Sequence, residues 1–151
     1  MKRTHYKGTK DEARALGAYV KLVRASESVS ARIHVHLAHA GLTVSQFGVM
    51  EALYHVGPLN QGELAKKILK SSGNITMVVD NLEKRGLVKR ERKAEDRRSY
   101  EIRLTIIGRR MIGSIFPRHA AKIVEQMNAL TRNEQEELSR LCRKVGLAGD
   151  K

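Results

Sequence analysis

The 151-residue sequence predicts a mainly α-helical fold with one small β-hairpin. Apolar residues recur with the spacing of amphipathic helices through most of the chain. Capping residues and glycines divide this pattern into four helices before residue 87 and two after residue 105. Between those positions the pattern changes to the alternation of two short strands around a charged turn.

The first predicted helix spans residues 11–40. This stretch contains no proline and only Gly17, and Gly41 ends it. One stripe of the helix is apolar and consists of Leu22, Val29, Ile33 and Leu37. The stretch is therefore predicted to be one long helix.

Two short helices follow, and each begins with a capping box. Thr43 and Gln46 start the second helix, which the Gly-Pro pair at 57–58 ends. Asn60 and Glu63 start the third helix in the same way. Both pairs have the three-residue spacing that lets each side chain bond the other residue's backbone N–H.

A tight turn, a fourth helix and the hairpin come next. The turn is Ser-Ser-Gly at residues 71–73, and Gly86 ends the helix. The helix is predicted to face the core with Ile75, Val78, Val79 and Leu82. The hairpin strands alternate through Val88, Arg90 and Arg92 and through Tyr100, Ile102 and Leu104.

Residues 105–148 are predicted to form the last two helices. Pro117 lies inside the first of them and is expected to kink that helix rather than end it. Thr131 and Glu134 form a capping box that starts the second. No internal repeat or low-complexity linker divides the chain, so we expect a single domain over residues 1–151.

The strong positive charge indicates a polyanionic partner, either nucleic acid or an acidic membrane surface. Lys and Arg total 29 against 16 Asp and Glu, a formal net charge of +13. No apolar run approaches the roughly 20 residues that cross a bilayer, so we expect no membrane partner and a cytoplasmic location. Aromatic residues make up only 4% and Trp is absent. Because single strands and RNA are bound by stacking on aromatic rings, this composition favours duplex DNA.

The third and fourth helices form a helix-turn-helix, and the hairpin after them makes the module of residues 43–104 a winged one. Such a module presents the start of its second helix to base edges in the major groove. That helix begins with small polar or flexible side chains, which can approach bases and phosphates closely. Residues 84–98 contain eight cations and three carboxylates, a density that suits a wing following the DNA backbone.

The stretch SSGNITMVVDNLEKRGLVKRERKAEDRRSYEIRLTIIGRRM, residues 71–111, resembles the recognition helix and wing of the MarR family. It includes the D-x-R motif of that wing, followed by L-T-x-x-G. The flanking helices are also similar, so the resemblance covers about residues 13–146. It implies a transcription regulator, acting as a repressor, that binds a pseudo-palindromic operator as a homodimer. Residues 11–40 and 105–148 are then the dimerisation helices.

The resemblance also implies roles for the wing motif. Arg98 is expected to enter the minor groove, Asp96 to brace the wing beside it, and Arg97 to contact a phosphate. The full set of expected DNA contacts is Asn60, Gln61, Ser71, Ser72, Asn74, Thr76, Met77, Asn81, Lys84, Arg85, Arg97 and Arg98. Two alternatives stay open: Asp96 and Arg98 can form a surface ion pair that only shapes the hairpin, and the polar residues that begin the fourth helix can serve as its caps.

A small aromatic effector, bound between the dimerisation helices and the winged module, is a further implication of the resemblance. The stretches LYHVGPL and SSGNIT are most similar to the quinone- and catechol-responsive branch of the family. This similarity suggests aromatic electrophile stress as the signal. The residues predicted to line the pocket are His34, His39, Phe47, Met50, Tyr54, Met111 and Phe116. The alternative is that these residues pack in the core or in the dimer interface.

We predict no metal site, no cofactor and no catalytic activity. His34 and His36 lie on opposite sides of their helix, and only His36 and His39 share a face, with no cysteine nearby. Cys142 is the only cysteine, which excludes an internal disulfide, and it is predicted to be a packed thiol rather than a redox sensor. The sequence contains no Gly-rich phosphate loop, nucleophile elbow or supported pair of catalytic carboxylates.

Two other kinds of protein fit the charge. One is a nucleoid or architectural protein that coats DNA without choosing a sequence. The other is a ribosome-associated or RNA-associated basic protein. The first would bind a palindromic operator and random duplex alike at one salt concentration. The second would be displaced from DNA by structured RNA at matched ionic strength.

Overall fold

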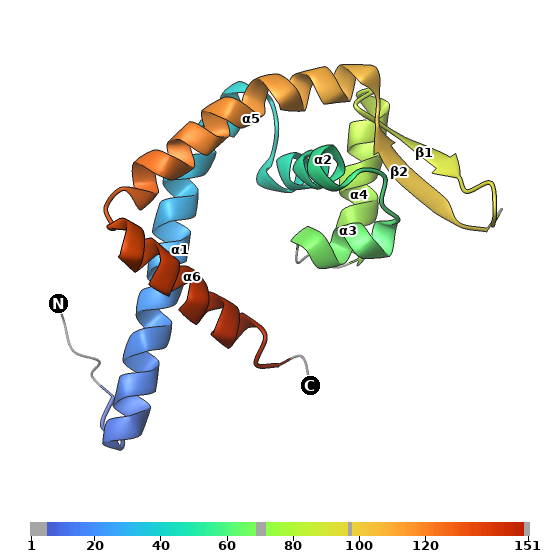
Figure 1. Cartoon of the computed structure of the whole chain (residues 1–151). Helices are drawn as coiled ribbons and strands as arrows, with labels where there is room; N and C mark the ends of the chain where they lie inside the picture. The colour runs from blue at the N-terminus through green and yellow to red at the C-terminus, as the bar shows by residue number, and fades with distance from the viewer. Residues whose placement is uncertain (1–5, 69–71, 97, 150–151) are drawn as a thin grey trace.

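The computed structural model describes residues 6–68, 72–96 and 98–149 (Figure 1). Within these residues the chain forms six helices and one two-stranded antiparallel sheet. In chain order the elements are α1 (Lys10–His39), α2 (Val44–Val56), α3 (Gln61–Ile68), α4 (Ser72–Lys84), β1 (Val88–Arg92), β2 (Tyr100–Leu104), α5 (Ile106–Met127) and α6 (Arg132–Gly146). The mainly helical fold with one hairpin is therefore confirmed.

The elements divide between two ends of the molecule. The winged module, α2 to β2, gathers at one end, and the hairpin projects from it (Figure 1). α5 starts directly after β2, crosses over the module and reaches α1 (Figure 1). α6 then lies at the α1 end, away from the hairpin. One long helix therefore connects the winged module to the other two helices.

The hydrophobic core lies inside the winged module. Its largest buried side chains from α2, α3, α4 and the hairpin are Met50, Leu53, Leu64, Ile75, Val79, Leu82, Val88 and Ile102. Leu37 near the end of α1 and Ile112 in α5 belong to the same cluster. β1 and β2 pair in register from Val88 with Leu104 to Arg92 with Tyr100. The core therefore anchors α1, α5 and the hairpin to one module.

The capping boxes predicted from the sequence are all formed. They are the pairs Thr43–Gln46, Asn60–Glu63 and Thr131–Glu134, with hydrogen bonds of 2.7–3.3 Å. A further box, Thr9 with Glu12, starts α1 one residue earlier than predicted. α5 continues through Pro117, as predicted. The helix boundaries follow from these local bonds, because each satisfies N–H groups that have no partner inside the helix.

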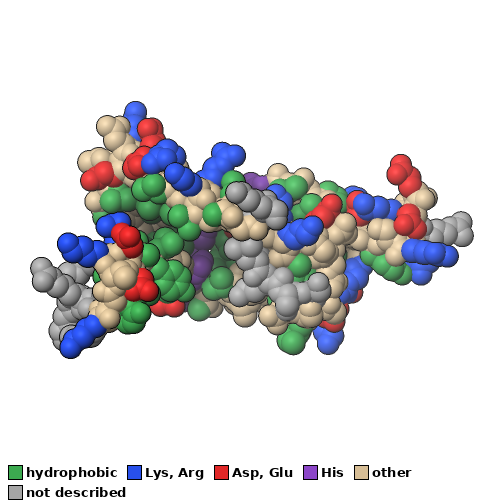
Figure 2. Space-filling view, turned by 90° about the horizontal axis from the view of Figure 1, so that it is seen from below, with side chains coloured by type: hydrophobic (Ala, Val, Ile, Leu, Met, Phe, Trp, Pro, Cys, Tyr) green, Lys and Arg blue, Asp and Glu red, His purple; other side chains and the backbone are tan. Residues whose placement is uncertain are grey.

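α6 contains no buried residue. Its apolar side chains Leu138, Leu141 and Val145 are all exposed. Cys142 is exposed as well, so the prediction that this thiol is packed is wrong for the single chain. Figure 2 shows hydrophobic side chains gathered on the side of the molecule that carries α1 and α6. The helix that sequence periodicity identifies as amphipathic thus has its apolar face open to solvent.

Candidate DNA-binding surface and ligand pocket

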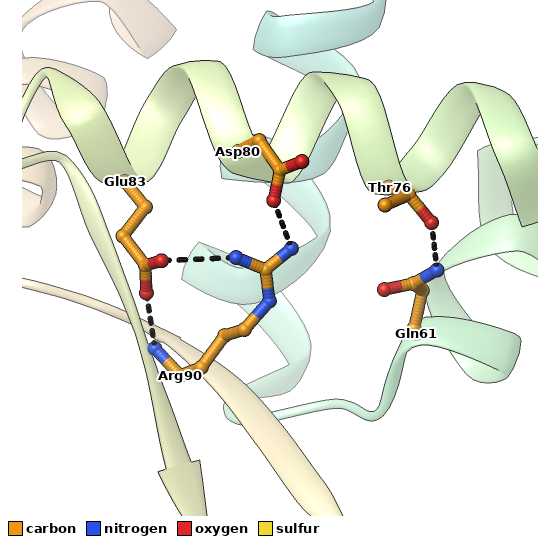
Figure 3. A network of polar contacts seen from close by, with 5 residues as sticks. All are labelled: Gln61, Thr76, Asp80, Glu83 and Arg90. Carbon is orange, nitrogen blue, oxygen red and sulfur yellow. Dashed lines mark hydrogen bonds and ion pairs between the residues drawn. The ribbon is translucent and has the colours of Figure 1, made fainter.

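α3 and α4 form the helix-turn-helix. Leu64 of α3 and Ile75 of α4 are completely buried in the common core. At the surface, Gln61 Nε2 donates a hydrogen bond of 2.5 Å to Thr76 Oγ1 (Figure 3). The start of α3 therefore holds the side chain of Thr76 in place on α4.

α4 turns its apolar residues inward and its other side chains outward. The outward residues among the expected DNA contacts are Asn74, Thr76, Met77, Asn81 and Lys84. Met77 is 63% exposed. Four of the five share one face, because they recur at intervals of three or four residues. Ser72 begins α4, whereas Ser71 lies outside the described residues.

Arg90 joins the wing to α4, as Figure 3 shows. Its Nη2 lies 2.6 Å from Asp80 Oδ1, and its Nη1 lies 2.9 Å from Glu83 Oε1. The Arg90 backbone N–H also donates to Glu83 Oε2 at 3.0 Å. The Arg90 side chain is only 24% exposed, so solvent screens these contacts less than it screens surface ion pairs. The network fixes the angle between the hairpin and α4.

The turn of the wing is closed by backbone hydrogen bonds. Asp96 Oδ1 accepts from the Arg98 backbone N–H at 2.9 Å, and the Asp96 carbonyl accepts from Ser99 N–H at 3.0 Å. Lys93 N–H donates to the Ser99 carbonyl at 3.0 Å. Asp96 thus holds the Arg98 backbone, and the exposed Arg98 side chain is left to point outward. The neighbouring Arg97 lies outside the described residues.

Besides Gln61 and Thr76, two further expected DNA contacts, Arg85 and Asn60, bond within the chain. Arg85 Nη1 donates to the Gly41 carbonyl at 2.8 Å, which ties the end of α4 to the loop before α2. Asn60 Oδ1 accepts from Glu63 N–H as the cap of α3. Both side chains therefore have a structural role that the sequence alone assigns only to Asn60.

A cavity of about 370 Å³ lies where α1, α2, α3 and α5 meet. Its lining is His34, Val44, Ser45, Phe47, Gly48, Glu51, Ala52, His55, Lys67, Ile68 and His119. A histidine is visible in the hollow between the α1 side and the winged module (Figure 2). The cavity thus combines aromatic rings with ionisable groups.

Three histidines gather beside this cavity. The His119 ring lies 6.1 Å from that of His34, 5.3 Å from that of His36 and 4.4 Å from that of Phe47, measured between centroids. His119 is only 5% exposed. Burial lowers the pKa of His119, and the charges of His36 and His34 lower it further. Burial and His36 lower the pKa of His34 as well. Both shifts favour the uncharged form of His34 and His119.

The histidine rings leave hydrogen-bonding capacity inside the molecule. Within the described residues, Nδ1 of His119 and both ring nitrogens of His36 are buried without a hydrogen-bond partner. Burial also raises the pKa of Glu51 across the cavity, although the charge of His55 acts in the opposite direction. A ligand in this cavity whose hydroxyl or carbonyl group reaches His119 Nδ1 would satisfy that atom, since buried polar groups are costly when unpaired.

Of the helices in the described ranges, none is both long and apolar enough to span a membrane. Across the same residues, no three His, Cys, Asp or Glu side chains are arranged as metal ligands.

Comparison with known proteins identifies the family. Residues 42–100 match the MarR family model. The chain is 36% identical over 134 residues to the HTH-type transcriptional regulator MhqR of Bacillus subtilis (strain 168), a match that covers 89% of this chain and 92% of that protein. This chain belongs to the MarR family. It is therefore a DNA-binding transcriptional regulator with a winged helix.

Solved structures are similar to this MarR-family chain over most of its length. Sco3205 of Streptomyces coelicolor, a MarR family regulator crystallised in complex with DNA, has a TM-score of 0.81 at 22% identity, covering 95% of this chain and 91% of that one. Bordetella bronchiseptica BpsR, whose DNA binding is regulated by 6-hydroxynicotinic acid, has a TM-score of 0.75 at 26% identity. That match covers 84% of this chain and 91% of the other.

The cavity of this MarR-family chain is lined by only some of the residues predicted to bind an effector. His34 and Phe47 line it, whereas Met50 is completely buried in the core. Tyr54, Met111 and Phe116 are half-buried and pack against that core. His39 instead lines a separate hollow of about 290 Å³ with His36 and Arg118. For Met50 in particular, the packing alternative is the one that the geometry supports.

The structure brings further residues of this chain to the candidate sites, beyond those that the sequence predicts. His119, Glu51, His55 and Lys67 line the cavity, and Asp80 and Glu83 hold Arg90. Asp80 and Glu83 are three residues apart on α4. Arg90 lies two residues after the buried Val88 on β1, so the two side chains share one face of the strand. This spacing was the available signal for the Arg90 network. His119 recurs at four-residue intervals with the apolar Met111 and Ile115, which indicates its face on the helix but not its neighbours, because these come from other helices.

Because of the lowered pKa values of His34 and His119, we expect acid to destabilise this MarR-family chain. Below the ordinary histidine pKa of about 6.5, the unfolded chain takes up protons that folded His34 and His119 resist. The stability that depends on neutral His34 and His119 is therefore complete above that pH and is lost as the pH falls toward their lowered pKa values. We expect the thermal midpoint to fall between pH 7.5 and pH 5, and to fall less in His119→Phe. The exposed His39 provides a control, since His39→Gln should keep the parent's pH dependence; an equally steep fall in His119→Phe would contradict the prediction.

Proposed function

We propose that this MarR-family regulator is a cytoplasmic homodimer that represses transcription by binding a pseudo-palindromic operator, without catalytic activity of its own. The observation that carries the proposal is the rigid connection between α4 and the wing. Arg90 bonds Asp80 and Glu83, so the outward face of α4 and the exposed Arg98 belong to one body. A helix in the major groove and a wing on the neighbouring minor groove require such a fixed relation.

Exposed apolar side chains at the α1 and α6 end support the homodimer. Leu138, Leu141 and Val145 of α6 and Tyr19 and Leu22 of α1 are all exposed in the single chain. Figure 2 shows hydrophobic side chains gathered on this side of the molecule, and large exposed apolar patches mark interaction sites. A second copy of the chain is the partner that a two-fold symmetric operator requires. The helices of residues 11–40 and 105–148 would then form the dimer interface.

The cavity beside His119 supports control by a small aromatic ligand that releases the regulator from its operator. Phe47 and the rings of His34 and His119 offer stacking surfaces, and His119 Nδ1 can accept or donate a hydrogen bond. A phenol, catechol or quinone presents a planar ring with one or two oxygen atoms, which matches this lining. BpsR responds to an aromatic hydroxy acid, a ligand of the same general shape.

Selection of bound duplexes from a random pool tests the DNA-binding proposal. We expect the selected duplex to be pseudo-palindromic and to bind at least about 10³-fold more tightly than shuffled duplex at one salt concentration. Sedimentation of the complex should give two chains per duplex. Equal affinities for selected and shuffled DNA would indicate an architectural protein instead. Phenols, catechols and quinones are then added to the selected complex, and release by none of them would reject the ligand proposal.

A further inference from the structure

The two faces of the wing differ in how their charges are used. Because β1 and β2 pair in register and side chains alternate along a strand, Arg90 and Arg92 share a face with Tyr100 and Ile102. The intervening residues occupy the other face. Near the base of the hairpin this face packs into the core through Val88 and Ile102. Arg90, farther along the same face, bonds Asp80 and Glu83 of α4.

On the other face, cations and carboxylates neutralise each other. Glu91 pairs with Lys89 at 2.6 Å and with Arg103 at 2.9 Å. Glu101 pairs with Lys93 at 3.3 Å and lies 3.9 Å from Arg103. The proximity of Lys89 and Arg103 lowers the pKa of Glu91, which keeps this carboxylate charged. Most of the positive charge on this face is therefore neutralised by Glu91 and Glu101 within the hairpin.

Arg92 is arranged differently. Its Nε donates a hydrogen bond of 2.9 Å to the Tyr100 hydroxyl, and its guanidinium carbon lies 5.3 Å from the centroid of the Tyr100 ring. Among the residues that the structure describes, no carboxylate pairs with Arg92. Arg92 is exposed, and Tyr100 is 44% exposed. A hydroxyl and an aromatic face thus hold the guanidinium in place without cancelling its charge.

We propose that Arg92, positioned by Tyr100, binds a phosphate of the DNA backbone between the grooves read by α4 and by the wing tip. The inference rests on the proposed function. A residue on the wing stem, between a helix in the major groove and a tip in the minor groove, lies opposite the sugar-phosphate strand that separates the grooves. The terminal guanidinium nitrogens have the planar fork that fits phosphate oxygens. Because Tyr100 already orders the side chain, binding loses less conformational freedom.

Salt dependence provides the test, because each phosphate contact contributes about 0.9 to the slope of log affinity against log salt. The full chain and the selected duplex are titrated at several KCl concentrations. With two wings per dimer, Arg92→Gln should reduce the slope by about 1.8 and weaken binding at every salt concentration. Tyr100→Phe keeps the ring and removes the hydroxyl, so it should weaken binding while the slope stays near the parent's. Lys89→Gln is the matched control, since Arg103 still pairs with Glu91 and the slope should not change.

The outcomes separate this inference from the proposed function. If the parent binds duplex, Arg98→Ala loses affinity and Arg92→Gln keeps the parent's slope and affinity, the inference is wrong and the proposed function stands. A parent that binds no duplex overturns both. An equal loss of slope in Lys89→Gln and Arg92→Gln also overturns the inference, since general charge would then explain both. Thermal unfolding of each variant provides the folding control: the midpoint should stay near that of the parent.

Discussion

Arg98→Ala is expected to weaken operator binding by about 30-fold to 10⁴-fold while the dimer stays intact. An arginine that contacts DNA contributes roughly 1–3 kcal/mol, and a homodimer places two wings on the duplex. Asp96 bonds the Arg98 backbone rather than its guanidinium, so the loss of the side chain leaves the turn closed. Titration of labelled operator at about 0.15 M salt measures the affinity, and sedimentation measures the dimer. The proposed dimer should be unaffected, because the wing tip lies far from α1 and α6 (Figure 1).

Two further variants give this experiment its controls. Arg14→Ala removes the same charge from the exposed start of α1, where Arg14 pairs with Asp11, and should bind operator like the parent. Asp96→Ala should weaken binding although it removes a negative charge, because the Arg98 backbone loses its acceptor. Asp96→Asn keeps an oxygen at that position and should retain more affinity. If Arg98→Ala binds as tightly as the parent, Arg98 is not the minor-groove residue.

The elements that the sequence predicts well are those that depend on neighbours along the chain. The capping box of Thr43 and Gln46 spans three residues, so its hydrogen bonds follow from local geometry. The hairpin register is local in the same sense, because it places Ile102 in the core and its charged neighbours outside. The recognition helix was predictable for the related reason that its apolar residues recur on one face.

The site residues that the sequence does not predict depend on contacts between distant elements. Arg90 looks like one more cation in a charged run until α4 brings Asp80 and Glu83 against it. The histidines show the same limit. His34 and His36 lie two residues apart on α1, a spacing that indicates opposite sides of a helix, yet both rings lie near His119 of α5. Periodicity describes one helix at a time, whereas this cluster is defined by how two helices cross.

Gly108→Ala is expected to lower the free energy of unfolding by about 3 kcal/mol or more, at or beyond the usual cost of overpacking a core. A Cβ at Gly108 would lie 1.9 Å from the Leu87 carbonyl oxygen and 2.9 Å from its carbon, and both are backbone atoms that cannot rotate away. The same carbonyl accepts a hydrogen bond from Thr105 N–H at 3.1 Å. Relief of the clash must therefore move the first turn of α5 away from Leu87, the residue that precedes β1. Urea unfolding, followed by circular dichroism, measures the loss.

Gly73→Ala is the matched control for this variant, because no atom of the described residues lies within 4 Å of its added Cβ. α4 should gain up to about 1 kcal/mol from the better helix former. Equal stability of Gly108→Ala and the parent would show that α5 does not depend on this contact.

The close approach of Gly108 to the Leu87 carbonyl explains why the L-T-x-x-G motif ends in glycine. Thr105 Oγ1 accepts from Gly108 N–H at 3.0 Å and donates to the Gly86 carbonyl at 2.6 Å. The Thr105 side chain therefore connects the start of α5 to the residues that precede β1. Since α5 also carries His119, a ligand that shifts this helix would move the wing through Gly108.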